Sequence, residues 1–286
     1  RTAVGLRQSL IQLIENSKQV FNGDSLMILD DIIEKRKNSV GKRKIGCTIA
    51  ESKKKALNID TPCCDFYKAL NGEKLSVISE VKKSVSFKIC NKKRISNLLK
   101  LQIAYENAGA DAISCLTEEF YFQGSSKYLQ EIRKAVDLPI LRKDFIFDEY
   151  QIFEARAIGA DAILLIAAVL DTDTMKYFKD IAEGLGMNCL FEAHSEKELE
   201  SILKCSPKIV GINNRNLKTF EVSLENTVRL SKMIPDKCLL VSESGIAIND
   251  DMKKVKSAGA DAVLIGETLM RSGNINDTMA SLRKDV

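Results

Sequence analysis

The sequence is poor in the residues that build metal centres. It contains one histidine, His194, and eight cysteines that form no Cys-x-x-Cys pair. Zinc sites usually need several closely spaced cysteine or histidine ligands. The sequence therefore predicts no metal ion. Three cysteines fall within apolar runs, at Cys115, Cys189 and Cys238, which indicates buried free thiols in a reducing compartment.

Long apolar runs and a strong excess of charge are also absent. The longest uninterrupted apolar stretch, residues 162–170, is about half the length of a membrane-spanning helix. The net charge of +4 is small for a protein that binds nucleic acid. We therefore expect a soluble cytoplasmic protein that binds neither membranes nor nucleic acids. Because the chain begins at Arg1 and not at methionine, removal of an upstream segment that targets an organelle is compatible with the sequence.

One four-residue motif occurs three times in the chain. Gly-Ala-Asp-Ala, followed by apolar residues, begins at Gly109, Gly159 and Gly259. Residues with helical spacing precede each copy, so each glycine stands where a helix needs a left-handed residue to end. The apolar run that follows has the length of a buried strand. The copies are separated by multiples of about 25 residues, which is the size of one strand plus one helix.

Further apolar runs at this pitch bring the number of predicted strands to eight. The additional runs lie at 76–81, 139–144, 188–193, 208–213 and 238–243. Continuous apolar strands are typical of parallel sheets that are covered on both faces. Eight of them, alternating with helices, predict a (β/α)8 TIM barrel. The alternative, an open doubly wound sheet, usually has a glycine-rich nucleotide-binding loop, and the sequence contains no Gly-x-Gly-x-x-Gly motif.

The first 70 residues contain no strand of this kind. Apolar residues at helical spacing over 6–21 and 25–40 predict helices there. We interpret residues 1–70 as an N-terminal helical extension that packs on a catalytic barrel of residues 71–286.

Polar residues follow the predicted strands, where barrels of this type have their active site. Seven of the eight strands end in charged, amide or hydroxyl side chains, and only the fourth ends in Ala167 and Ala168. Neighbouring lysines and carboxylates shift one another's pKa values, so that a lysine acid and a glutamate base both act near neutrality. Gly245 and Gly266 follow the last two strands, and their spacing fits either phosphate binding or a tight turn.

Several segments resemble the indole-3-glycerol phosphate synthase family over about residues 26–284. The most specific are LPILRKDFIFDEYQ (138–151) and INNRNLKTFEV (212–222), and ISEVKK, VSESGI and GADAVLIGETLMRSG also match. The resemblance implies a lyase of tryptophan biosynthesis that needs no cofactor. Its substrate would be 1-(2-carboxyphenylamino)-1-deoxyribulose 5-phosphate, and its products indole-3-glycerol phosphate, carbon dioxide and water.

The resemblance also implies roles for individual residues. Lys143 would be the general acid that protonates the ketose oxygen, and Glu192 the base of the later dehydration. The residues that orient the substrate and stabilise the cationic intermediate would be Glu80, Lys82, Asn213 and Glu243. Arg215 matches the arginine beside the family's asparagine, and the phosphate-holding turns match Ser244, Gly245, Gly266 and Glu267. The apolar slot for the anthranilate ring would comprise Phe122, Phe145 and Leu217.

One loop departs from the family pattern. Val85, Ser86 and Phe87 stand where the family has Ser-Pro-Ser. Losing a hydroxyl that binds substrate costs on the order of 0.5–1.5 kcal/mol, so either Ser84 or Ser86 substitutes for it or turnover is reduced.

Two alternatives therefore stay open besides an active synthase. One is a non-catalytic or weakly active descendant that binds a phosphosugar. The other is a different phosphosugar barrel enzyme such as phosphoribosylanthranilate isomerase, although the first strand lacks the reactive cysteine that the isomerase uses there. The sequence does not fix the oligomeric state and is compatible with a monomer.

Overall fold

The strands form a closed parallel barrel in the order β1-β2-β3-β4-β5-β6-β7-β8. The computed structural model describes residues 25–81, 91–216, 219 and 221–286. The strands are β1 (Ser76–Val81), β2 (Ala112–Leu116), β3 (Ile140–Lys143), β4 (Ala162–Ile166), β5 (Asn188–Ala193), β6 (Ile209–Asn213), β7 (Leu239–Glu243) and β8 (Ala262–Ile265). The predicted barrel is confirmed, and the open sheet is excluded.

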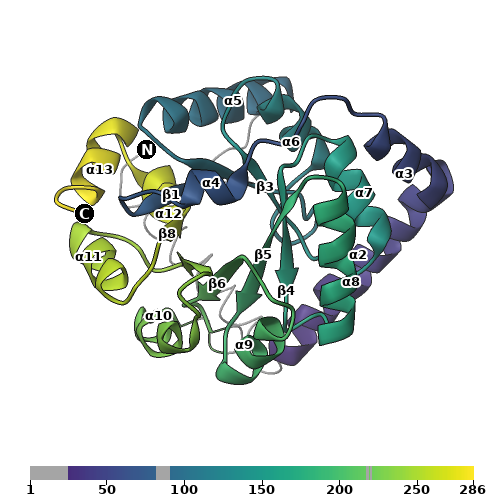
Figure 1. Cartoon of the computed structure of the whole chain (residues 1–286). Coiled ribbons are helices and arrows are strands. Elements are labelled where there is room, and N and C mark those ends of the chain that lie inside the picture. Colours follow the sequence, from purple (N-terminus) through teal and green to yellow (C-terminus); the bar gives the residue numbers. More distant parts are fainter. Residues whose placement is uncertain (1–24, 82–90, 217–218, 220) are drawn as a thin grey trace.

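Helices surround the barrel on its outside (Figure 1). They are α5 (Asn91–Asn107), α6 (Ser126–Arg133), α7 (Glu149–Ala157), α8 (Thr172–Gly184), α9 (Glu196–Leu203), α10 (Glu225–Leu230), the 3-10 helix η1 (Ser231–Met233), α11 (Asn249–Ser257), α12 (Glu267–Arg271) and α13 (Ile275–Leu282). In the described part of the chain, none of the helices combines the length and hydropathy that a membrane crossing requires.

Three helices precede the first strand: α2 (Ser25–Gly46), α3 (Ile49–Leu57) and α4 (Phe66–Leu70). Helix α3 packs against α7. Phe66 and Leu70 of α4 are fully buried against the residues inside the barrel. The helix predicted over 25–40 is confirmed as part of α2, whereas the one predicted over 6–21 lies outside the described residues. The division of the chain at residue 70 stays a prediction.

The three Gly-Ala-Asp-Ala copies form the same turn. Their glycines have φ angles of +84°, +93° and +94°, and backbone N–H groups of the glycine and the next alanine close the end of each helix. The Asp carboxylate of each copy then accepts a hydrogen bond from a backbone N–H near the start of the preceding strand. The pairs are Val77–Asp111, Ile140–Asp161 and Leu240–Asp261, at 2.7, 2.8 and 2.7 Å. The repeat therefore joins neighbouring strands at the N-terminal rim of the barrel.

Candidate active site

The polar residues at the ends of the strands point inward because of strand geometry. Lys143 lies two residues after Leu141, and Glu192 two after Leu190, and both leucines belong to the core inside the barrel. Alternate side chains of a strand point to the same face. Lys143 and Glu192 therefore share the inside of the barrel at its C-terminal rim, although they come from different strands.

A cavity of about 460 Å³ opens at this rim. Leu29 of helix α2 also lines it, so the segment before the first strand contributes to its wall. The sequence-predicted site residues that line the cavity are Glu80, Phe122, Lys143, Phe145, Glu192, Asn213, Arg215, Ser244, Gly245, Gly266 and Glu267. Glu243 is fully buried beside it. Lys82, Leu217 and the altered loop residues Val85, Ser86 and Phe87 lie outside the described residues.

Lys143 lies among three carboxylates. Its Nζ is 2.6 Å from Glu243 Oε2, 3.6 Å from Glu192 Oε2 and 3.9 Å from Glu80 Oε2. Burial alone would lower the pKa of the ammonium group, but the three negative charges outweigh burial and raise the pKa of Lys143 above its ordinary value. Lys143 is therefore a partly buried cation that is protonated throughout the neutral range.

The two carboxyl groups nearest the lysine differ in proton affinity. Burial raises the pKa of Glu243 to about 7, although Lys143 opposes the shift. Burial also acts on Glu192, but there the positive charges of Lys143 and His194 prevail, and the pKa of Glu192 is below its usual value. Near neutrality, Glu192 is thus the ionised member of the pair and can accept a proton.

Two glycines, which lack a side chain, provide the space that the Glu243 and Glu80 carboxylates occupy. A Cβ atom on Gly211 in strand β6 would lie 2.1 Å from Glu243 Oε1. A Cβ on Gly266 would lie 2.8 Å from Glu80 Oε1. Since real Cβ atoms do not approach other atoms so closely, any larger residue at Gly211 would displace the carboxyl group that contacts Lys143.

The turns after β7 and β8 also line the cavity. Ser244 and Gly245 have φ angles of +68° and +92°. A Cβ on Gly245 would lie 2.8 Å from Val222 Cγ1, so tight packing alone accounts for this glycine. Arg215 joins these turns in the cavity wall. Phosphate binding by this group of residues stays a prediction.

Two phenylalanines form an apolar wall of the cavity. The rings of Phe122 and Phe145 lie 6.2 Å apart between centroids. The loop that bears Phe122 is fixed by Glu118, whose buried carboxylate accepts hydrogen bonds from three successive backbone N–H groups, each at 2.8 Å. The wall is thus preformed, and it has the flat, apolar character that suits an aromatic ring.

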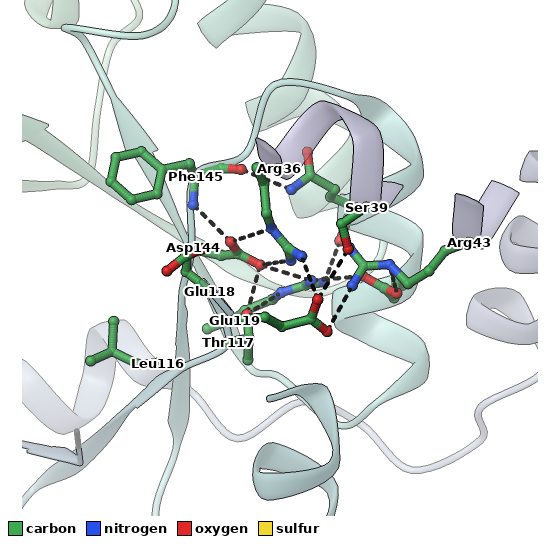
Figure 2. Close-up of polar contacts among 12 residues, drawn as sticks. Arg36, Ser39, Arg43, Leu116, Thr117, Glu118, Glu119, Asp144 and Phe145 are labelled. Carbon is green, nitrogen blue, oxygen red and sulfur yellow. Dashed lines mark hydrogen bonds and ion pairs between the residues drawn. The ribbon is translucent and has the colours of Figure 1, made fainter. Parts of the chain in front are cut away.

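A buried charge network holds the strand that bears Lys143 (Figure 2). Because alternate side chains face opposite ways, Asp144 points out of the barrel, toward helix α2. Its carboxylate accepts hydrogen bonds from Arg36 Nε at 2.9 Å, from Arg36 Nη2 and from Thr117 Oγ1 at 2.7 Å. It also accepts one from the backbone N–H of Phe145 at 2.9 Å, while the Phe145 ring points away from the charges.

Arg142 extends the same network toward α7. Its guanidinium is 3.0 Å from Asp144 Oδ2 and 2.6 Å from Glu154 Oε2. Arg36 and Arg142 are both fully buried. The charged neighbours of Lys143 are visible in the sequence as Arg-Lys-Asp, but nothing in the sequence indicates that Arg36 meets them. Sequence reasoning did not identify this network.

Comparisons with known proteins agree with this geometry. Residues 29–282 match the family model described as indole-3-glycerol phosphate synthase. A protein of that name from Ruminiclostridium cellulolyticum is 47% identical over 262 residues, covering 90% of this chain and 99% of its own length. One from Endomicrobium trichonymphae is 46% identical over 261 residues, covering 90% and 100%.

The fold is also similar to that of more distant barrels. The crystal structure of 3-hexulose-6-phosphate synthase from Salmonella typhimurium has a TM-score of 0.61 at 12% identity, covering 73% of this chain and 97% of its own. This likeness concerns the fold alone. The matches over nearly the whole length confirm the resemblance predicted from the sequence: the chain belongs to the indole-3-glycerol phosphate synthase family.

Proposed function

We propose that the chain is an enzyme of tryptophan biosynthesis, a carboxy-lyase that closes the indole ring of its substrate. The substrate is 1-(2-carboxyphenylamino)-1-deoxyribulose 5-phosphate, and the products are indole-3-glycerol phosphate, carbon dioxide and water. The observation that supports this most strongly is the position of the Lys143 ammonium among three carboxylates at the mouth of the barrel. The free thiols of the described cysteines fit a reaction in the cytoplasm.

The cavity matches the three parts of this substrate. The arene fits against Phe122 and Phe145. The phosphate fits the opposite side, where Arg215, Ser244 and Gly245 border the cavity. The ketose then lies between them, over Lys143. Binding both ends of the substrate holds the aromatic carbon near the ketose carbon, which supplies part of the rate enhancement by proximity.

Ring closure uses the lysine. The aromatic carbon that bears the carboxylate attacks the ketose carbonyl carbon, and the carbonyl oxygen takes a proton from Lys143 Nζ. An alkoxide is more basic than an amine, so this transfer is favourable even though the pKa of Lys143 is raised. The positive charge that develops on the ring system is stabilised by Glu80 and by the ionised form of Glu243. Loss of carbon dioxide returns its bonding electrons to the ring.

Dehydration uses Glu192. The new hydroxyl group takes up a proton from solvent and leaves as water, and Glu192 accepts the proton that the adjacent methylene carbon releases and returns it to solvent. The low pKa of Glu192 keeps it ionised and ready for this step. The overall reaction consumes one proton from solvent, which recharges the lysine.

Turnover of the ribulose phosphate, followed by indole fluorescence, tests the proposal directly. Lys143→Met should lower kcat by about 10²–10⁴ with a smaller change in KM, as expected for removal of a general acid. The control is Lys197→Met, which changes an exposed lysine of α9 and should leave both constants unaltered. Ligand binding without turnover by the wild-type chain would instead favour a non-catalytic descendant, and normal turnover by Lys143→Met would assign the proton to another donor.

A further inference from the structure

The only histidine of the sequence lies next to the proposed base. His194 follows Glu192 by two residues, just beyond strand β5, and its side chain is 10% exposed. Its Nε2 is 3.4 Å from Glu192 Oε1, and its Nδ1 is 3.2 Å from Glu198 Oε2. The imidazole therefore lies between two carboxylates, one in the catalytic cavity and one on helix α9.

Glu198 is fixed by the start of helix α9. Its Oε2 accepts a hydrogen bond from the backbone N–H of His194 at 2.8 Å, and its Oε1 accepts one from Ser195 Oγ at 3.0 Å. Ser195 in turn accepts a bond from the backbone N–H of Glu198 as the N-cap of the helix. Because these bonds hold the Glu198 carboxylate, the Nδ1 position of the imidazole is set, and Nε2 lies within ion-pair distance of Glu192 without a hydrogen bond to it.

The protonation state of the His194 ring decides whether its interaction with the Glu192 carboxylate is attractive or repulsive. With Nδ1–H donated to Glu198, a neutral imidazole would present a lone pair to the Glu192 carboxylate, which is unfavourable. An imidazolium instead places a positive charge within 3.2–3.4 Å of both carboxylates. Burial lowers the pKa of His194, but the charges of Glu198 and Glu192 outweigh it and raise the pKa above the ordinary value.

Other charged groups also face this site. They come from strands β3 and β7, from the loop after β6 and from helix α10, and they are Lys143, Glu243, Arg215, Glu221 and Arg229. None of the cations is among the groups that dominate the shift, whereas Glu198 and Glu192 are in direct contact with the ring.

We propose that His194 is a positioning residue, whose imidazolium holds the Glu192 carboxylate toward Lys143 for the dehydration step. The inference rests on the proposed function, in which Glu192 is the base. It predicts that activity declines at alkaline pH as His194 loses its proton, because the neutral ring no longer holds Glu192.

The single histidine allows a test that does not depend on turnover. In the NMR spectrum of the full chain labelled with ¹⁵N-histidine, one imidazole should titrate with a pKa above the ordinary value of about 6.5. The titration should move to lower pH in both Glu192→Gln and Glu198→Gln. An unshifted histidine, or one that does not respond to Glu192→Gln, would overturn the inference.

Kinetics supply the second test. His194→Gln should lower kcat by about tenfold, as expected when a base loses the group that orients it, with little change in KM, and the alkaline decline that coincides with the NMR titration should disappear. The control is Arg229→Gln, which removes a half-exposed charge of helix α10 and should leave the pH profile unchanged. If His194→Gln does not fold, the pH profile of Glu198→Gln, whose alkaline decline should begin at lower pH, takes its place.

The outcomes separate the two proposals. Normal synthase turnover with an unchanged profile in His194→Gln would refute the role of the histidine and leave the proposed function intact. A wild-type chain that binds but does not convert the substrate would refute both, even if the histidine titrates as expected.

Discussion

Replacing Arg36 with methionine should destabilise the protein by about 3 kcal/mol and slow catalysis. Arg36 is the fully buried cation that helix α2 contributes to Asp144 (Figure 2). Removing one partner of a buried ion pair costs about 3–5 kcal/mol because the remaining charge is left uncompensated. The Asp144 carboxylate keeps its contacts with Arg142 and Thr117, so we expect the lower end of this range.

The loss is measurable by thermal unfolding. At roughly 2 °C per kcal/mol for a domain of this size, Tm should fall by about 6 °C. The catalytic effect follows from the position of Asp144 between Lys143 and Phe145, whose backbone N–H it binds. We expect kcat to decrease more than KM increases, because the lysine and the aromatic wall lose their fixed support.

A neighbouring lysine provides a matched control. Lys35→Met removes a charge of the same helix, but the ion pair of Lys35 with Asp31 is about half exposed, and exposed pairs contribute little to stability. Its Tm should lie within about 2 °C of the wild-type value. A similarly small change in Arg36→Met, with normal kcat, would show that the network neither stabilises the fold nor supports the lysine.

Three other predictions concern the carboxylates of the barrel. Gly211→Ala should displace Glu243 and lower kcat by about tenfold or more, since a Cβ there would lie 2.1 Å from Oε1 of Glu243. The control is Gly184→Ala in helix α8, which has open space around it and should leave kcat unchanged. Equal kcat values in the two variants would contradict the steric argument. Because the pKa of Glu243 is raised to about 7, its ionised form is lost as the pH falls through that value, and kcat/KM should decline below about pH 7. This decline should be absent from the residual activity of Glu243→Gln. Asp261→Ala leaves the backbone N–H of Leu240 without its acceptor and should cost about 1–3 kcal/mol of unfolding free energy in urea titrations, with kcat unaffected; reduced kcat would show that the two rims are coupled.

The barrel and the inward direction of the site residues could be predicted from the sequence because both follow from short-range periodicity. The glycine of each Gly-Ala-Asp-Ala copy ends a helix and locates the next strand, and the two-residue period of a strand places Lys143 on the same face as Leu141. Roles in phosphate and arene binding follow only from the family resemblance, and they stay predictions.

The supporting contacts could not be predicted in this way. Arg36 and Asp144 are in contact although they are 108 residues apart in the sequence. The contact depends on how α2 is rotated against the barrel, which helical periodicity alone does not determine. In the sequence, His194 stands out only as an isolated potential metal ligand, and its contact with Glu198 depends on where helix α9 begins. The space that Gly211 leaves for Glu243 depends on the register between β6 and β7.

The Asp-to-backbone bonds at the N-terminal rim also bear on how this protein can change. They tie adjacent strands together without using any residue of the loops that border the cavity. Insertions, deletions or exchanges in those loops therefore leave barrel closure untouched. The same scaffold can accept new loops for new ligands.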